Sequence, residues 1–380
     1  MRIGVVTVGR SDYGIYTPVL RALQKSPTLE FELLVSGTHL AAQFGKTVSE
    51  IERDGFPIGA RVPILESGDE PIDIANAISR GVSGFAAVYA RQRPELLMVL
   101  GDRFEMYSAA LAAVPFNIPI AHLHGGELTL GAMDDALRHS LTKLSHLHFV
   151  STEDYARRVR QLGEEAWRVT VSGAPSLDNL TRVHRVAPRD LRERFGIDVE
   201  TSFLLVTFHP ATLESDIQEQ GERFIAALSA LAMPTVVTLP NADVHGTILR
   251  KQFRDRAATG APMLLIENLG TEAYFSVMSY ASAMVGNSSS GIIEAASFGL
   301  PVVNVGSRQD GRIKPANVID VQCNTDDIVR GVERATSEQF RKSIKGLRNP
   351  YGDGHASERI TARLEEIKDP AALIHKRFTG

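Results

Sequence analysis

The stretch GNSSSGIIEAASFGLPVVNVGSRQDGR, residues 286–312, combines a strand end, a polar turn, a helix, a second strand and a basic loop. Apolar residues 283–286 predict the first strand, and residues 287–291 form the turn. We expect the helix to begin at Ile292 and the next strand to cover residues 301–305. The turn suits an anion, because orphan backbone N–H groups and the positive end of the helix dipole converge there. The stretch therefore predicts a βαβ unit that binds phosphate.

Further polar residues of the same stretch extend this prediction to a nucleotide. Glu294 lies one turn into the expected helix, where its carboxylate can accept hydrogen bonds from a ribose diol. Two arginines follow the second strand, at the edge where open parallel sheets bind ligands. The plainer alternative is a serine-rich helix cap with surface arginines, but a cap needs one hydroxyl, not three. We predict that a nucleoside diphosphate is bound by Ser288, Ser289, Ser290, Glu294, Arg308 and Arg312.

The composition is that of a soluble globular protein long enough for two domains. The chain has 380 residues, of which 43% are hydrophobic and 23% charged, and a formal net charge of −4. This charge indicates neither a nucleic-acid nor a membrane partner, and no apolar run could span a bilayer. The single cysteine, Cys323, and the lack of an export signal predict a cytoplasmic protein without disulfides. Metal-ligand spacings are missing, so we expect no metal and no cofactor.

Short apolar runs alternate with amphipathic segments along the chain. Such runs, bounded by turn residues, predict parallel sheets covered by helices on both faces. A polar, charged break at residues 183–202 predicts a linker with a short surface helix, and a helix is expected near the end, at residues 357–368. The fold class is therefore α/β, with two Rossmann-like, doubly wound domains. The expected strands are residues 3–8, 31–35, 96–100, 118–122, 147–150, 170–172, 203–208, 235–239, 263–266, 283–286, 301–305 and 318–321.

Polar clusters follow several expected strands of the first domain. GRSDYG, residues 9–14, offers Arg10 to a phosphate group, although one arginine in a first turn is a weak signal. GDRFE, residues 101–105, places the acid Asp102 beside the base Arg103, and the leading glycine lets a ligand approach closely. A helix cap is the alternative role for Asp102. We interpret both clusters as parts of a site.

The fourth expected strand leads into a denser polar region. HLHGGE, residues 122–127, sets His124 in a glycine-rich turn, and Asp134 and Asp135 then open a helix. One of these carboxylates could serve only the helix dipole. Asp134 could pair with Arg138 four residues on, either for structure or to orient a catalytic carboxylate.

A histidine also ends the first strand of the second domain. His209 precedes a proline, which holds it in extended backbone at the end of residues 203–208. A lone histidine is often a structural residue, but one at a strand end facing a cleft between two domains suits catalysis.

These motifs occur together, and in this order, in one family. GRSDYG, GDRFE, HLHGGE with GAMDDALRH, HP, and GNSSSGIIE with RQDGR make the chain resemble the UDP-N-acetylglucosamine 2-epimerases, over residues 1–360. The GGE and DDALRH segments and SHLHFVST resemble the hydrolysing branch. The resemblance implies a GT-B-type fold with domains at residues 1–182 and 183–355. It also implies a final helix, in residues 356–380, that returns to the first domain, an active site in the cleft between the domains, and a homodimer or homotetramer.

The resemblance further implies a reaction, in which UDP-GlcNAc and water give N-acetylmannosamine and UDP. UDP leaves to give a 2-acetamidoglucal, which is hydrated with inversion at C2, and carboxylates and a histidine around one sugar ring can supply the proton transfers. By position, the catalytic residues are Asp102, His124, Asp134, Asp135 and His209. The substrate-binding residues are Arg10, Arg103, Asn241, Leu269, Tyr274, Ser288, Ser289, Ser290, Glu294, Arg308 and Arg312. Tyr274 would stack on uracil, with Phe275 as the rival, near the backbone of Leu269.

One position departs from the family pattern. Members that make N-acetylmannosamine for sialic acid often carry Glu where this chain has His124, which leaves the identity of the base open. The change could also mark another substrate, UDP-2,4-diacetamido-2,4,6-trideoxyglucose, on the route to legionaminic acid. We place UDP-GlcNAc first. The alternatives of another class are a GT-B glycosyltransferase, which would not need the acidic cluster, and a non-catalytic nucleotide-sugar sensor.

Overall fold

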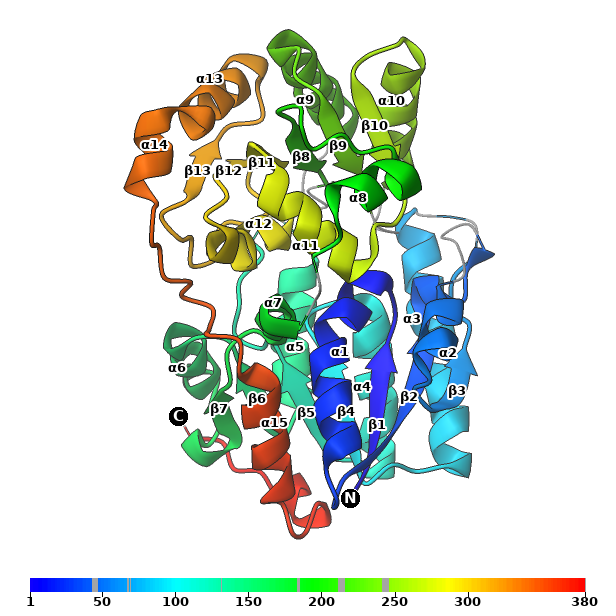
Figure 1. Cartoon of the computed structure of the whole chain (residues 1–380). Helices are drawn as coiled ribbons and strands as arrows, with labels where there is room; N and C mark the ends of the chain where they lie inside the picture. Colours follow the sequence, from blue (N-terminus) through cyan, green and yellow to red (C-terminus); the bar gives the residue numbers. More distant parts are fainter. Residues whose placement is uncertain are drawn as a thin grey trace. The chain divides into compact units, whose positions relative to one another are not determined.

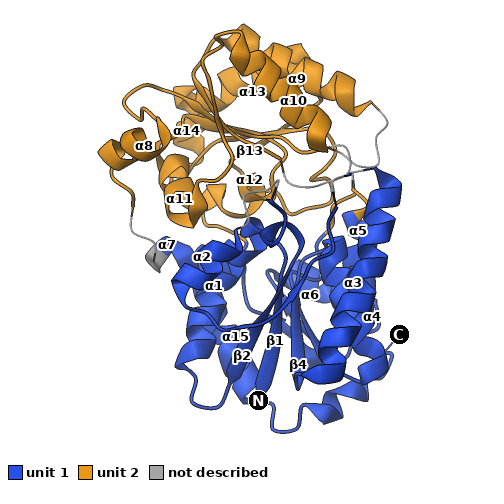
Figure 2. Ribbon diagram, turned by 90° about the vertical axis from the view of Figure 1, so that its right-hand side faces the viewer, with its two compact units in different colours: residues 1–127, 134–181, 351–380 blue, residues 128–133, 182–350 orange. Residues whose placement is uncertain are grey.

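The computed structural model describes residues 1–42, 47–66, 68, 70–130, 132–182, 185–210, 216–240 and 246–379. The chain divides into two compact units, coloured separately in Figure 2. Unit 1 comprises residues 1–127, 134–181 and 351–380, and unit 2 comprises residues 128–133 and 182–350. The sequence-based division assigns residues 128–133 to the first domain. In the structure this segment belongs to unit 2, where the Leu130 N–H donates to the Asp310 carbonyl at 3.3 Å.

The described part of unit 1 is built on a sheet of seven parallel strands in the order β3-β2-β1-β4-β5-β6-β7. In four strands in the middle of the sheet every residue except Arg2 is buried, as expected of strands covered on both faces. The strand order reverses between β1 and β4, so ligand-binding side chains are expected where these two strands end. The strands are β1 (Arg2–Thr7), β2 (Glu30–Ser36), β3 (Ile58–Val62), β4 (Leu96–Leu100), β5 (Ile120–Leu123), β6 (Leu147–Val150) and β7 (Val169–Val171).

Helices with one apolar face cover this sheet. In the first of them Tyr16, Leu20 and Leu23 recur every three to four residues and are fully buried. The helices are α1 (Arg10–Lys25), α2 (Val48–Asp54), α3 (Pro71–Arg91), α4 (Phe104–Ala113), α5 (Asp134–Leu144), α6 (Glu153–Gln161) and α15 (Ala356–Glu365), with α7 (Asn179–Arg182) at the unit boundary.

The final helix, α15, belongs to unit 1 and lies beside α1 (Figure 1). Its first turn is capped from elsewhere in the chain. The buried carboxylate of Asp178 accepts hydrogen bonds from the backbone N–H groups of Ala356, at 2.9 Å, and Ser357, at 2.6 Å. These bonds satisfy two donors that a helix start leaves open, and they attach the last part of the chain to unit 1.

Unit 2 repeats the architecture with a sheet of six parallel strands among its described residues, in the order β10-β9-β8-β11-β12-β13. The order reverses between β8 and β11, which makes their carboxyl ends the equivalent ligand position. The strands are β8 (Leu204–Thr207), β9 (Thr235–Thr238), β10 (Met263–Ile266), β11 (Ala283–Gly286), β12 (Val302–Val305) and β13 (Val318–Val321). The helices are α8 (Pro188–Phe195), α9 (Ile217–Leu231), α10 (Gly246–Ala258), α11 (Gly270–Tyr280), α12 (Ser289–Ile293), α13 (Thr325–Thr336) and α14 (Glu338–Ser343).

Aromatic side chains anchor the core of unit 2 behind β8. Phe208 and Phe224 stack with their ring centroids 4.3 Å apart, and Phe253 meets Phe224 edge-on at 6.3 Å. All three are buried, so the end of β8 is held rigidly. Within the described residues, no helix has the length and apolar character needed to cross a membrane.

Candidate functional site

Asn287 joins the ends of the two central strands of unit 2. Its N–H donates to the Thr207 carbonyl at 3.0 Å, at the end of β8. Its side-chain amide accepts from the His209 N–H at 2.7 Å and donates to the His209 carbonyl at 2.9 Å. These contacts fix the backbone of His209, which is itself buried. Sequence analysis missed Asn287, although its place between Gly286 and the serines in the motif was a usable signal.

The serine turn follows directly and corrects the predicted helix start. Helix α12 begins at Ser289, not at Ile292, because Ser288 is the N-cap and its Oγ accepts a bond from the Ser290 N–H at 3.3 Å. The helix has only five residues, so Glu294 ends it instead of lying one turn inside. A dipole this short contributes little. The anion-binding character of the turn therefore depends on its hydroxyl and backbone N–H groups.

Tyr274 of α11 reaches the serine turn with its hydroxyl group. Burial raises the pKa of Tyr274 to about 12, with the negative charge of Glu294 adding to the effect and hydrogen bonds to Ser290, Thr207 and Ser288 opposing it. The phenol therefore stays protonated at neutral pH and can donate. Phe275 packs edge-on against Phe298, with centroids 5.5 Å apart. The stacking of Tyr274 on uracil stays a prediction, as does the role of buried Leu269, the N-cap of α11.

The loop after β12 brings one of its two predicted arginines to the serine turn. Arg308 donates through Nη1 to the Asn287 carbonyl at 3.1 Å, and Gln309 donates to the same oxygen at 2.8 Å. Arg312 instead donates through Nε to the Leu128 carbonyl at 3.2 Å, which directs it to the segment 128–133. The structure thus places Arg308, and not Arg312, beside Asn287. Asn241 lies outside the described residues.

In unit 1, Asp102 follows β4 and forms a partly buried ion pair with Arg138 of α5. Arg138 is 1% exposed, and its Nη1 also donates to the His124 carbonyl at 2.8 Å. The glycine before this acid, Gly101, has φ +75°, and a Cβ at this position would meet no atom within 4 Å. That open space beside Asp102 agrees with the close ligand approach predicted there. Arg138, whose expected partner was Asp134, is a site residue that sequence analysis did not assign.

His124 follows β5 in left-handed backbone, with φ +62°. Its N–H donates to the Phe149 carbonyl at 2.9 Å, and its ring Nδ1 lies 2.6 Å from Oε1 of Glu127. A non-glycine residue in this conformation costs free energy, and such strain is often found at functional positions. The structure therefore brings Asp102, His124, Glu127 and Arg138 into one cluster, of which Asp102 is the partly exposed member.

The other two predicted carboxylates, Asp134 and Asp135, form the first turn of α5 and are half-buried. Oδ2 of Asp135 lies 3.5 Å from Nε2 of His139. Burial lowers the pKa of His139, the charge of Arg138 lowers it further, and Asp135 opposes both. His139 is therefore mostly neutral at pH 7.

Arg10 and Arg103 lie at the starts of helices that follow β1 and β4. Arg103 binds Glu105 through Nε and Nη2, each bond 3.1 Å long, and Glu105 is fully buried. Arg10 is the first residue of α1. Burial, with help from the positive charge of Arg10, lowers the pKa of His39 to about 4. His39 is thus a neutral side chain at the end of the sheet.

Asp12 is a second residue of this edge that sequence analysis did not assign. Its Oδ2 accepts bonds from the Thr7 hydroxyl at 2.6 Å and from the Val8 N–H at 3.0 Å. Burial raises the pKa of Asp12 to about 7, against the lowering effects of these bonds and of Arg103. The acid is thus about half protonated near neutral pH.

The Asp12→Asn variant is expected to gain stability relative to the wild type as the pH rises. The pKa of the Asp12 carboxyl is about 3.8 in the unfolded chain and about 7 in the folded one. Proton binding therefore stabilises the folded wild type at low pH, and this stabilisation is lost as the pH rises through the folded pKa. The free-energy difference between variant and wild type should grow by about 2–3 kcal/mol between pH 5 and pH 8. Urea unfolding of both proteins at pH 5 and pH 8 measures this free-energy difference. The same difference at both pH values would contradict the raised pKa of Asp12.

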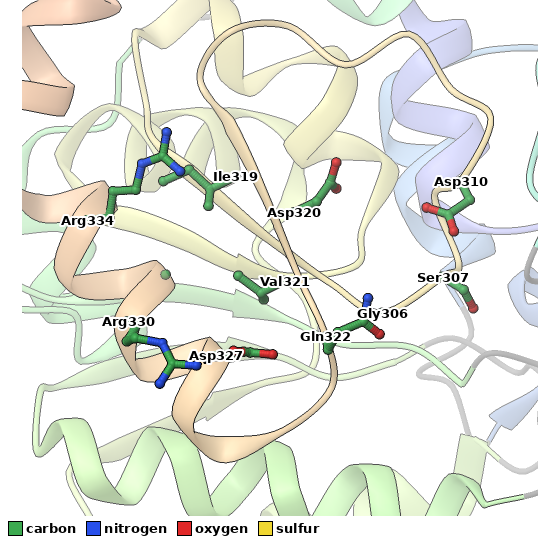
Figure 3. Close-up of a pocket in the computed structure, with 11 residues that line it drawn as sticks. Gly306, Ser307, Asp310, Ile319, Asp320, Val321, Gln322, Asp327, Arg330 and Arg334 are labelled. Carbon is green, nitrogen blue, oxygen red and sulfur yellow. Dashed lines mark hydrogen bonds and ion pairs between the residues drawn. The ribbon is translucent and has the colours of Figure 1, made fainter.

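A cavity in unit 2 is lined by none of the predicted site residues. It holds about 450 Å³ and is lined by β13 and α13 and by Ser307 and Asp310 of the loop that carries Arg308. Figure 3 shows Arg330 and Arg334 reaching it from α13, opposite Asp320. The lining mixes both charge signs. In the described ranges of the chain, no group of three or more His, Cys, Asp or Glu side chains could hold a metal ion.

Comparison with known proteins gives a family. The family model described as UDP-N-acetylglucosamine 2-epimerase matches residues 21–365. The chain is 37% identical to the UDP-N,N′-diacetylbacillosamine 2-epimerase (hydrolyzing) of Legionella pneumophila, over 99% of this chain and 98% of that protein. It is 34% identical to the GDP/UDP-N,N′-diacetylbacillosamine 2-epimerase (hydrolyzing) of Campylobacter jejuni, over 99% and 98%. The UDP-N-acetylglucosamine 2-epimerase of Neisseria meningitidis is 28% identical, over 88% of each chain.

Solved structures share the fold. The S. aureus MnaA structure with UDP superposes with a TM-score of 0.82 at 20% identity, covering 96% of each chain. The Neisseria meningitidis UDP-GlcNAc 2-epimerase bound to UDP-GlcNAc gives 0.81 at 20% identity, covering 97% of this chain and 100% of that one. The predicted GT-B-type fold of two Rossmann-like domains is confirmed. The position of the active site in a cleft between the domains stays a prediction.

Proposed function

Because the chain belongs to the UDP-N-acetylglucosamine 2-epimerase family and is a UDP-sugar 2-epimerase, we propose that it catalyses the hydrolysing form of this reaction. In this form, UDP is released and the free 2-epimeric sugar is the second product. The observation that carries the proposal is the acid–base cluster at the carboxyl ends of β4 and β5, in which His124, Glu127 and Arg138 are buried and Asp102 is partly buried. A protein that only bound UDP would have no need of such a costly cluster.

The residues of unit 2 and those of unit 1 have different roles in the proposed reaction. The serine turn of unit 2, with Arg308, holds the diphosphate and stabilises the charge that develops when the C1–O bond breaks. Glu294, buried at the end of α12, accepts hydrogen bonds from the ribose. These groups are hydroxyls, backbone donors and a guanidinium, the donor types that stabilise a leaving phosphate.

Unit 1 supplies the proton transfers at the sugar. One group takes the C2 proton while UDP departs, which gives a 2-acetamidoglucal with a C1–C2 double bond. A second group returns a proton to the other face of C2, and water adds at C1 to complete the inversion. The groups proposed for these steps are Asp102, His124, Asp134 and Asp135, together with His209 of unit 2. General acid–base catalysis by one such group accelerates a reaction by about 10²- to 10⁴-fold.

The relatives change the order of the candidate substrates. Sequence analysis placed UDP-GlcNAc first, and the two relatives at 37% and 34% identity carry the name of the 2,4-diacetamido-2,4,6-trideoxy sugar. The relative named for UDP-GlcNAc is 28% identical. We therefore propose UDP-N,N′-diacetylbacillosamine as the substrate and keep UDP-GlcNAc as the second candidate. His124 is consistent with this choice, because the family resemblance implies Glu at this position in many members that make N-acetylmannosamine for sialic acid.

Kinetic measurements on each UDP-sugar in turn identify the preferred substrate. The protein is incubated with each UDP-sugar, and UDP and free sugar are separated by anion-exchange chromatography. We expect kcat/KM to be at least about tenfold higher for the diacetamido sugar, the factor that one or two lost polar or apolar contacts supply. A preference for UDP-GlcNAc would transfer the assignment to it. Formation of an epimeric UDP-sugar without free UDP would contradict the hydrolysing reaction.

A further inference from the structure

His124 is paired with Glu127 through one ring nitrogen. Nδ1 of His124 lies 2.6 Å from Oε1 of Glu127, and the two side chains are 6% and 1% exposed. A carboxylate oxygen can only accept a hydrogen bond, so the imidazole donates from Nδ1. In the neutral ring the other nitrogen, Nε2, then carries a lone pair. The contact thus selects one tautomer of His124.

Glu127 is itself held in place by two further contacts. The Ser151 hydroxyl donates to the same Oε1 at 3.1 Å, and Nη1 of Arg138 lies 3.8 Å from Oε2. A buried carboxylate is stable in its charged form only when such partners surround it. Glu127 is therefore a fixed acceptor, and it can stabilise a positive charge on the imidazole when His124 takes up a proton.

Nε2 of His124 is buried and has no hydrogen-bond partner among the residues that the structure describes. An unpaired polar atom in such a place costs free energy, as does the positive φ of His124. Both costs fall on a residue at the carboxyl end of β5, where ligands of parallel sheets bind. A general base needs such a nitrogen, with a free lone pair and no hydrogen-bond partner, to take a proton from the substrate.

We propose that Glu127 is the positioning residue that fixes the tautomer of His124, and that Nε2 of His124 is the atom that takes the C2 proton. This inference rests on the proposed 2-epimerase function. The C2–H bond breaks, its electron pair forms the C1–C2 double bond, and UDP leaves with the electrons of the C1–O bond. The proton bonds to Nε2, and the imidazolium that forms is stabilised by the charge of Glu127.

The same unit contains a matched pair that serves as an internal control. His148, inside β6, lies with Nε2 3.2 Å from Oε2 of Glu164, and both side chains are fully buried. Here the carboxylate selects the opposite tautomer, with the proton on Nε2. Glu164 also binds Lys143 and Lys376, so this pair has a structural role in holding the end of the chain.

Glu127→Gln is expected to lower kcat by about 10²- to 10⁴-fold and to change KM and the Kd of UDP by less than about threefold. Glutamine removes the negative charge that stabilises the imidazolium, and where its NH2 group donates to Nδ1 it also places the ring proton on Nε2. The control Glu164→Gln is expected to keep kcat within about threefold of the wild type. Equal losses of kcat in both variants would show a structural effect and overturn the proposal, as would an unchanged kcat in Glu127→Gln.

Nitrogen NMR of histidine-labelled wild-type protein tests the tautomer without substrate, and a variant is needed only to assign the signals. We expect His124, identified by loss of its signals in His124→Gln, to carry its proton on Nδ1, and His148 to carry it on Nε2. A proton on Nε2 of His124 overturns the positioning role of Glu127, whatever the activity. A wild-type protein with the expected tautomer that releases UDP from neither UDP-sugar would instead overturn the proposed function, and the proton-transfer role with it.

Discussion

Asp102→Asn is expected to lower turnover by about 10²- to 10⁴-fold while the Kd of UDP stays within about threefold of the wild type. Asparagine keeps the shape of the side chain but can neither exchange a proton nor carry the charge that pairs with Arg138. The serine turn, Glu294 and Arg308, which are proposed to hold UDP, belong to unit 2, and Asp102 belongs to unit 1. Steady-state kinetics and calorimetric titration with UDP measure the two quantities separately.

The matched control for this variant is Asp198→Asn. Asp198 also pairs with an arginine, Arg192, at 2.6 Å, but both side chains are exposed, so the change should affect neither turnover nor stability noticeably. Because Arg138 is buried, urea unfolding must show that Asp102→Asn is folded at the assay temperature. If a folded variant loses UDP binding as strongly as turnover, Asp102 acts in binding and its catalytic role is wrong.

Gly286→Ala is expected to lower the free energy of unfolding by about 3 kcal/mol and to weaken UDP binding. Gly286 ends β11 with φ +136°, and a Cβ there would lie 2.0 Å from the Thr207 carbonyl oxygen. Because backbone and not a flexible side chain is in the way, β8 and β11 would have to separate. That movement would displace Asn287, which joins the two strands beside the serine turn.

Gly299→Ala isolates the steric part of this effect. Gly299 also has positive φ, +58°, but a Cβ there would meet nothing within 4 Å. This variant carries only the cost of left-handed backbone, about 1 kcal/mol, and should bind UDP normally. Urea unfolding and UDP titration of both variants measure the loss of stability and of UDP affinity caused by each substitution. Similar losses in the two would mean that the close approach of β8 and β11 has no energetic consequence.

Central strands were predictable from the sequence because burial on both faces leaves a continuous apolar run. Residues 96–100, 147–150 and 283–286 have the bounds expected of them. Strand β3 (Ile58–Val62) was missed, because it lies at the edge of its sheet, is only partly buried and alternates with glycine and arginine. The helix start at Ile292 was wrong because Ser288, which we assigned to the anion-binding turn, is also the N-cap and starts the helix at Ser289.

The candidate site was predictable where polar residues directly follow an apolar strand. Ligands of parallel sheets bind at the carboxyl ends of the strands, and this rule points to Asp102, His124, His209 and the serine turn. The contacts of Asn287 and Arg138 were not predictable, because they join strand ends and helices distant in the sequence. The pairing of His124 with Glu127 depends on a positive φ that no local pattern revealed.

The central claim, that removal of the C2 proton is coupled to release of UDP, is tested most directly by proton NMR in D2O. The protein is incubated with UDP-N,N′-diacetylbacillosamine and, in parallel, with UDP-GlcNAc. The account predicts free UDP together with a free 2-epimeric sugar that carries deuterium at C2, formed at equal rates. Free UDP with a sugar that keeps both its C2 proton and its original C2 configuration would contradict the account, because it would show simple hydrolysis.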